Sequence, residues 1–146
     1  MSPSLHALGR ALLPILFIVA GVGKFMNIPG TAAYIGPNRF PAVPGLEAAL
    51  GMNTPTILAW LTAGVETFGG LLVLIGLFTR SAATLLFLLT AATIFYFHNF
   101  WDIADAAQMA QQRTQALKNL SIMGGLLLLM ANGAGPYSVD GRGGRS

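Results

Sequence analysis

The sequence predicts an all-α integral membrane protein, a bundle of four membrane-spanning helices. Of its 146 residues, 54% are hydrophobic and only 9% are charged, whereas an average soluble domain has about 25% charged residues. Four apolar segments follow one another, at about residues 10–27, 55–79, 81–99 and 116–133. Each approaches the roughly 20 residues that a helix needs to cross the hydrocarbon core. We therefore expect one transmembrane domain over residues 1–146.

The composition also excludes several classes of function. Cysteine is absent, which excludes disulfides, thiol redox chemistry, Cys-ligated metals and covalent haem attachment within this chain. The net charge of +3 comes from basic residues that are scattered at the ends of the apolar segments. Basic residues in such places are typical of membrane proteins, and they form no patch for nucleic acid. The expected partner is the lipid bilayer.

The first span begins near Arg10 and ends at about residue 27. Arg10 with the apolar run after it also fits a signal peptide that is cleaved near Gly23. We favour a membrane span, because the run continues past Gly23 and the three later spans need an anchor of this kind.

Residues 27–54 form a loop rich in proline and glycine, which break long helices. Two short pieces, 31–35 and 46–50, fit single helical turns along the membrane interface. The loop leaves two interpretations open, an interfacial connector and a lid over a functional site. At the other end of the chain, the glycine-rich residues 134–146 are expected to form a flexible tail.

The second and third spans meet at Thr79 and Arg80 without a loop between them, which predicts an antiparallel hairpin. The third span ends in the aromatic run FYFHNFWD, residues 95–102, which is typical of the boundary between lipid and water. A polar segment, 102–115, is expected to separate it from the fourth span.

Glu66 lies in the middle of the second span, where a carboxylate costs several kcal/mol unless a partner, a proton or a polar cavity stabilises it. We take Arg10 and Arg80 to mark one membrane boundary. Glu66 lies fourteen residues before Arg80, and Lys24 lies fourteen residues after Arg10. Both are therefore about 21 Å from that boundary, on antiparallel helices.

Two further polar residues come to a similar depth. Asn119 lies at this depth on the fourth span, and His98 lies about one turn further, near the opposite boundary. Gly69 and Gly70 follow Glu66 by three and four residues, so they share its helical face and allow a neighbouring helix to approach. We predict one intramembrane ligand-binding site, formed by Lys24, Glu66, His98 and Asn119.

Each of these residues also has an interpretation without a ligand. Lys24 can extend to the membrane surface, His98 can form a hydrogen bond at the interface, and Asn119 can face water in the first turn of its helix. Lys118 competes with Asn119 for the inward position, because they lie about 100° apart on the helix. We choose Asn119, since a neutral amide adds no charge beside the Lys24–Glu66 pair. The secondary candidates are Thr93, Trp101 and Lys118, and no metal site is expected.

Five segments of the sequence resemble the DoxX family of small bacterial inner-membrane proteins. They are AGVGKFM (20–26), VETFGGLLVLIGLFTR (65–80), HNFWD (98–102), LKNLSIMGGLLLL (117–129) and GAGPYSVD (133–140). The resemblance covers about residues 8–140 and implies a four-helix membrane bundle. It also implies a link to thiosulfate:quinone oxidoreductase and to membrane redox complexes.

Two classes of function remain open. The first is a subunit or accessory of a quinone-linked membrane oxidoreductase, whose partner is a larger redox complex or a second copy of the chain. Lysine, histidine and asparagine would donate hydrogen bonds to a quinone carbonyl, and Glu66 would relay protons. No cofactor is expected within the chain, apart from such a quinone. His6 and His98 lie on opposite sides and cannot ligate one haem iron. The second class is a non-enzymatic small transporter or a chaperone-like partner of another membrane protein.

The expected location is the bacterial inner membrane. Basic residues are equally frequent on the two sides of the predicted bundle. The terminal side has Arg10, Arg80, Arg142 and Arg145, and the other side has Lys24, Arg39, Arg113 and Lys118. If the two lysines point into the bundle, the remaining arginines favour cytoplasmic N- and C-termini.

Overall fold

The computed structural model describes residues 2–36 and 39–143. This part of the chain is helical without strands, which confirms the all-α class. Its elements are α1 (Pro3–Leu12), α2 (Ile15–Met26), α3 (Ile28–Ile35), α4 (Pro44–Leu50), α5 (Thr54–Ile75), α6 (Thr79–Phe97), the 3₁₀ turn η1 (Phe100–Asp102), α7 (Ala106–Asn132) and α8 (Val139–Gly143).

Three segments within the described ranges are long and apolar enough to cross a membrane. They are Pro3–Met26, Thr54–Ile75 and Thr79–Asp102, and they correspond to the first three predicted spans. The first starts seven residues earlier than expected, so Pro14 lies in its middle and not in its first turn. Proline has no N–H to donate to the preceding turn, and the helix is interrupted there between α1 and α2.

The longest helix, α7, is not among these three segments, although it has 27 residues. It begins at Ala106, about ten residues before the predicted fourth span, and takes in most of the segment 102–115 that was expected to be a connection. Asp105 explains the early start, because its carboxylate accepts a hydrogen bond of 2.8 Å from the backbone N–H of Gln108. This N-cap is followed by alanine and glutamine residues that favour helix.

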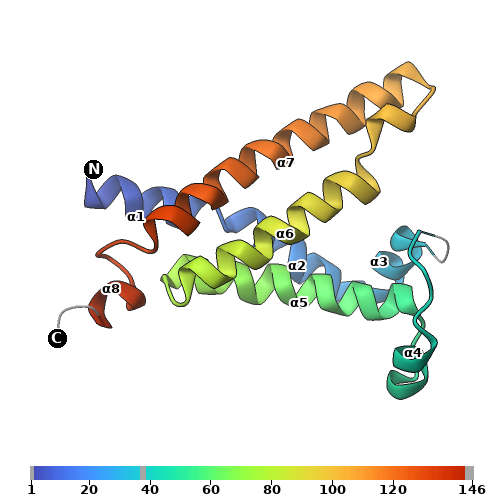
Figure 1. The fold of residues 1–146 in the computed structure, drawn as a ribbon, viewed down its shortest axis with the longest axis horizontal. Coiled ribbons are helices and arrows are strands. Elements are labelled where there is room, and N and C mark those ends of the chain that lie inside the picture. The colour runs from blue at the N-terminus through green and yellow to red at the C-terminus, as the bar shows by residue number, and fades with distance from the viewer. Residues whose placement is uncertain (1, 37–38, 144–146) are drawn as a thin grey trace.

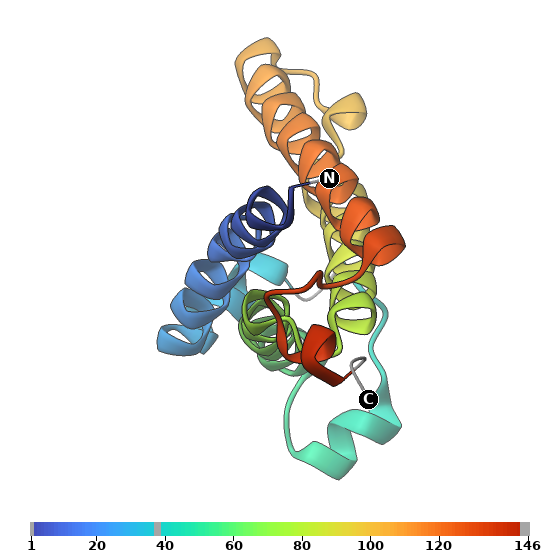
Figure 2. The same ribbon diagram turned by 90° about the vertical axis from the view of Figure 1, so that its left-hand side faces the viewer.

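The long helices share a core, although they come from distant parts of the chain. Helix α2 packs against α5, α5 against α6, and α6 against α7, as Figures 1 and 2 show from two sides. Buried side chains from all four form one cluster, consisting of Phe17, Val73, Ala82, Ala83, Leu86, Leu126 and Leu129. A second cluster joins α3 to α5 through Ile28, Ile35, Ala59 and Ala63.

Helices α1 and α8 lie at the same end of the molecule as the α5–α6 turn, as was expected for the segments near the termini (Figure 1). Arg10 donates hydrogen bonds to the carbonyls of Val73, at 3.0 Å, and Leu74 at the end of α5, and to that of Tyr137. It is only 5% exposed, so its side chain is buried in the protein beside the end of α5. The buried guanidinium binds carbonyls in the last turn of this helix, where carbonyls lack partners within the helix.

The segment after α7 is attached to the same turn. The carboxylate of Asp140 accepts hydrogen bonds of 2.9 Å from the backbone N–H groups of Phe78 and Thr79, and its own N–H donates to the carbonyl of Gly76. Burial of Asp140 raises the pKa of this carboxylate, but the two N–H donors and the charge of Arg10 outweigh that effect and lower it. Contacts of this kind give residues 134–141 a defined place, where a flexible tail was expected.

Residues 27–54 contain two helices of about two turns each, longer than the single turns expected. Asn27 caps α3 by accepting a hydrogen bond from the N–H of Gly30. In α4, the carboxylate of Glu47 accepts from the N–H and the hydroxyl of Thr54, at 2.6 and 2.7 Å. These bonds hold the loop to the start of α5, at the end of the molecule away from the termini (Figure 1).

Candidate functional site

Lys24 and Glu66 form an ion pair between α2 and α5. The ammonium of Lys24 donates a hydrogen bond to Oε2 of Glu66, and the two side chains are 28% and 12% exposed. This confirms the expected pairing of the two charges at matching depths. A neutral pair is far less costly inside a membrane than either charge by itself.

A close contact between the helix backbones brings these two side chains together. Gly21 lies one turn before Lys24 on α2. It faces α5 next to Thr67, the residue that follows Glu66. A Cβ on Gly21 would lie 2.6 Å from the backbone N of Thr67 and 2.9 Å from the carbonyl O of Ala63. Only glycine therefore permits this approach of α2 to α5. Gly70 has the same role one turn further, where a Cβ would meet Ile18.

A large apolar cavity lies on one side of Glu66. Its volume is about 450 Å³, and Lys24, Glu66, Thr93 and His98 provide polar groups in its lining. The remaining wall is mostly aliphatic and aromatic, and helix α3 contributes Thr31, Tyr34 and Ile35 to it. Tyr34 stacks on Phe97 at 5.4 Å between ring centroids, so α3 closes this cavity from one side.

Arg39, just beyond α3, lies against the same aromatic wall. Its guanidinium carbon is 4.6 Å from the centre of the Phe97 ring, and Nη1 donates to the carbonyl of Tyr96 at 2.9 Å. These contacts tie the predicted loop to the end of α6. The observed position of α3 favours the interpretation of this loop as a cover over a site.

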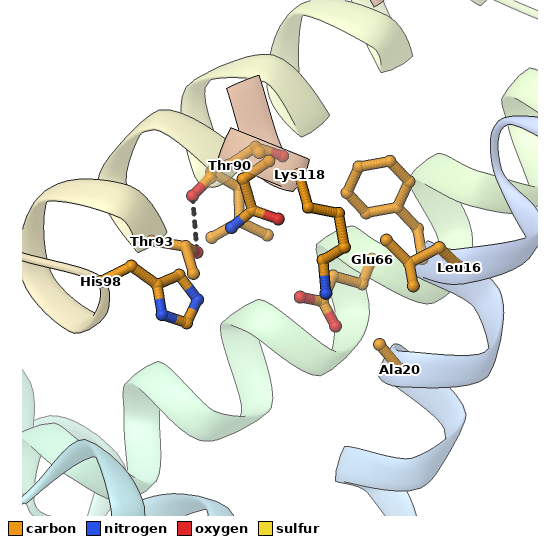
Figure 3. Close-up of a pocket in the computed structure, with 10 residues that line it drawn as sticks. Leu16, Ala20, Glu66, Thr90, Thr93, His98 and Lys118 are labelled. Atoms are coloured by element: carbon orange, nitrogen blue, oxygen red, sulfur yellow. Dashed lines mark hydrogen bonds between the residues drawn. The ribbon is translucent and has the colours of Figure 1, made fainter. Parts of the chain in front are cut away.

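A smaller, more polar cavity of about 190 Å³ lies on the other side of Glu66. Figure 3 shows its lining residues, with Glu66, Lys118 and His98 around the space and Thr90 and Thr93 on α6. Asn119 also lines it and is buried, whereas Lys118 lines it from an exposed position on α7. The choice of Asn119 as the buried residue is confirmed, but the cavity contains both side chains.

His98 lies at the end of α6 and lines both cavities. One ring nitrogen, Nδ1, is 2.7 Å from Oε1 of Gln112 on α7. Gln112 was not predicted, because the sequence placed it in a connecting segment. The hydrogen bond orients the imidazole toward the site, while it joins the ends of α6 and α7.

The structure thus gathers all four primary candidates and two of the secondary ones around Glu66. The prediction that Trp101, the third secondary candidate, belongs to the site is corrected. Trp101 is exposed, packs on Phe95 and Phe100, and lines neither cavity. Its position in η1, beyond the end of α6, points it away from the bundle. Thr90, which lies one turn before Thr93 on the same span, also lines the small cavity, although it was not among the candidate residues.

The candidate site offers hydrogen-bond donors and one carboxylate in mostly apolar surroundings. Within residues 2–36 and 39–143, no three histidine or acidic residues come close enough to one another to hold a metal ion. The arrangement suits an organic ligand with a polar head, because a few polar groups would orient the head while the apolar wall surrounds the rest.

Comparison with known proteins places the chain in a family. The DoxX family model matches residues 5–99, and a second model, the SURF4 family, matches residues 56–144. The chain is 31% identical to the inner membrane protein YphA of Escherichia coli over 96% of this chain and 91% of that protein. It is 37% identical to the E. coli inner membrane protein YqjF, over 90% and 85% of the two chains.

A more limited match is to a protein of Bacillus subtilis named putative oxidoreductase CatD, 33% identical over 52% of this chain and 46% of that protein. No solved structure matches the chain. The DoxX model matches more than half of the chain, and the alignments with the two E. coli relatives cover nearly all of it. This integral membrane protein therefore belongs to the DoxX family.

Proposed function

We propose that this protein binds a quinone-class molecule in the apolar cavity beside Glu66, as a subunit or accessory of a membrane oxidoreductase. The observation that carries the proposal is the Lys24–Glu66 pair at the wall of a cavity of about 450 Å³. The name of CatD, a putative oxidoreductase, supports the same class of function.

The composition of the cavity supports a ligand with a small polar head and an apolar body. Lys24 and His98 supply N–H donors suited to a quinone carbonyl oxygen. Tyr34, Phe97 and the aliphatic side chains of α5 and α6 would surround the ring and the beginning of an isoprenoid tail. A carboxylate close to these donors can exchange protons with the ligand.

The proposed setting is the bacterial inner membrane, in which α7 forms the fourth span of a bundle. The part of α7 from Ala116 to Asn132 would measure about 25 Å, close to the thickness of the hydrocarbon core. Leu126 and Leu129 of this part belong to the common core. Asn119 faces the polar cavity, and Lys118 can extend toward the boundary.

The test is to purify the protein from its native membranes in mild detergent and to measure bound quinone by mass spectrometry. Ala92 lines the apolar cavity from α6 and is not a member of the ion pair, so Ala92→Phe should fill the space and reduce bound quinone at least about tenfold. Leu88→Phe is the control, because Leu88 lies one turn away on α6 and is 58% exposed. It should retain wild-type loading.

Equal quinone loading of the two variants would contradict the proposed site. If no quinone is present but a larger membrane protein co-purifies in a fixed ratio, the non-enzymatic alternative, a chaperone-like partner, replaces this proposal. Uptake of a small solute by reconstituted vesicles, without bound quinone, would instead indicate a transporter.

A further inference from the structure

We infer that the smaller cavity is filled with water and conducts protons to Glu66, which separates it from the apolar cavity. The inference deepens the proposed function and rests on its placement of α7 in the membrane. It does not depend on the identity of the ligand.

The first observation is that the two cavities share a wall. Glu66, Thr93 and His98 line both of them, together with Leu89. Beyond this wall the linings differ in character. The small cavity adds three polar residues, Thr90, Lys118 and Asn119, and three apolar ones from α2, whereas most of the further residues of the large cavity are aromatic or aliphatic. Glu66 is thus in contact with a polar space on one side and an apolar space on the other.

The second observation is an amide that is open to the cavity. Asn119 is only 9% exposed and lines the small cavity, and within residues 2–36 and 39–143 its side chain forms no hydrogen bond to the protein. Buried amides are nearly always hydrogen-bonded to protein or to ordered water. A cavity of about 190 Å³ has room for several water molecules.

The threonine hydroxyls of α6 would bind water on the opposite wall. Thr90 donates to the carbonyl of Leu86 at 2.7 Å, and Thr93 donates to that of Leu89 at 2.9 Å. Each hydroxyl lines the cavity and keeps its lone pairs available to accept a hydrogen bond from water. With the amide of Asn119, they give water the two to four polar partners that it needs.

The groups around Glu66 support reversible proton uptake. Lys24 faces it from α2, Lys118 lines the polar cavity from α7, and His98 lies at the end of α6. Tyr34 from α3 and Tyr96 from α6 are the other titratable groups, both in the apolar cavity. One acidic group thus lies near two lysines, which favour its ionised form, so a proton that Glu66 takes up is readily passed on.

The proposed step is a simple proton transfer. A hydronium ion in the small cavity gives its proton to the Glu66 carboxylate, one O–H bond breaks and one forms, and water remains. No electron moves in this step. The same proton can then pass to an oxygen of a ligand in the apolar cavity, because Glu66 lines both spaces.

The natural absence of cysteine permits a direct test of the water. We would introduce Asn119→Cys and, as a control, Ser121→Cys in the full chain in membrane vesicles, and label each with a small impermeant methanethiosulfonate. Ser121 is on the exposed surface of α7, and its hydroxyl donates to the carbonyl of Leu117. If that surface faces lipid, a thiol there stays protonated and unreactive, because the thiolate is the nucleophile.

We expect Asn119→Cys to react at least about tenfold faster than Ser121→Cys, although Asn119 is the more buried residue. Faster reaction of Ser121→Cys, or equal rates, would overturn the inference. Loss of quinone binding with rapid labelling of Asn119→Cys would refute only the proposed ligand. Bound quinone together with slow labelling of Asn119→Cys would refute only the water-filled cavity.

Infrared spectroscopy tests the proton path itself. The carboxylic C=O band that is lost in Glu66→Gln identifies the protonated group, and its shift in D₂O measures exchange. Labelling of Asn119→Cys should block the cavity and slow this exchange at least about tenfold, relative to the same variant before labelling. Unchanged exchange, or the absence of a Glu66 band at every pH where the protein is folded, would overturn the proton path.

Discussion

At the scale of the residue, charged side chains stabilise the molecule in two ways. Lys24 and Glu66 form a partly buried ion pair in the bundle, and removal of one member leaves the other without compensation. At the α5–α6 turn, the buried Arg10 binds carbonyls at the end of α5, and the exposed carboxylate of Asp140 binds N–H groups at the start of α6. Each arrangement leads to a prediction.

Glu66→Ala should lower the free energy of unfolding by about 3 kcal/mol, because it leaves the ammonium of Lys24 unpaired. Glu66→Gln should lose much less, since the amide oxygen can still accept the hydrogen bond. Thermal unfolding in lipid nanodiscs measures both. The double variant Lys24→Leu/Glu66→Leu is the control and should be more stable than Glu66→Ala. Equal melting temperatures for the wild type and Glu66→Ala would refute the buried pair.

Asp140→Ala should destabilise the protein by about 1 kcal/mol at neutral pH, since it removes the acceptor for two N–H groups at the start of α6. The folded protein lowers the pKa of Asp140, so this stabilisation is present above the ordinary aspartate value, about 3.9. It is lost as the pH falls through the lower pKa of the folded state.

The difference in melting temperature between wild type and Asp140→Ala should therefore shrink below about pH 4. Urea unfolding at several pH values gives the same comparison. A difference that grows toward low pH would show that the carboxylate does not stabilise the turn in its ionised form.

At the scale of the element, the contact between α2 and α5 places the candidate site. Gly21 allows the two backbones to approach at Thr67, and this approach puts Lys24 beside Glu66. Small residues commonly have this function in membrane helices. The distance between the helices is therefore as important for the ion pair as the charges are.

Gly21→Ala should lower the melting temperature and weaken the Lys24–Glu66 pair, because the new methyl group would lie within 3 Å of backbone atoms of α5 that cannot easily move. An overpacked contact of this kind typically costs about 1–3 kcal/mol. Gly23→Ala is the matched control on the same helix, where a Cβ meets nothing within 4 Å. It should leave stability unchanged or raise it. Equal effects of the two substitutions would argue against the close contact.

At the scale of the whole molecule, the termini and the α5–α6 turn lie together at one end, whereas the candidate site lies in the half toward α3 (Figure 1). The ion pair holds Lys24 inside the bundle, so Lys24 is left out of the count of basic residues at the membrane boundaries. The remaining basic residues then favour the terminal side as the cytoplasmic one.

A fusion of alkaline phosphatase to the C-terminus should accordingly be inactive, since this enzyme needs the periplasm to form its disulfides. A fusion within the loop between α3 and α4, near Phe40, should be active. Activity of the C-terminal fusion together with an inactive fusion near Phe40 would reverse the proposed orientation. Activity of a C-terminal fusion together with that at Phe40 would mean that α7 does not cross the membrane.

The sequence by itself determined the helical class, the first three spans and the need of Glu66 for a partner. These features depend on local hydropathy and on the large cost of an isolated charge in lipid, both of which can be assessed residue by residue. Equal depth on antiparallel helices made Lys24 a candidate for that partner, together with Asn119, because helix rise is constant, and the structure shows that the partner is Lys24. The role of the site in binding a ligand stays a prediction.

Only the tertiary structure decided how the helices are rotated and where their ends meet. It placed both Lys118 and Asn119 at the polar cavity, turned Trp101 away, and joined His98 to Gln112. It also buried Arg10 against carbonyls that lie more than sixty residues away in the sequence. Such contacts depend on the packing of whole helix faces, including the approach at Gly21, and packing between distant segments leaves no periodic signal in the sequence of either one.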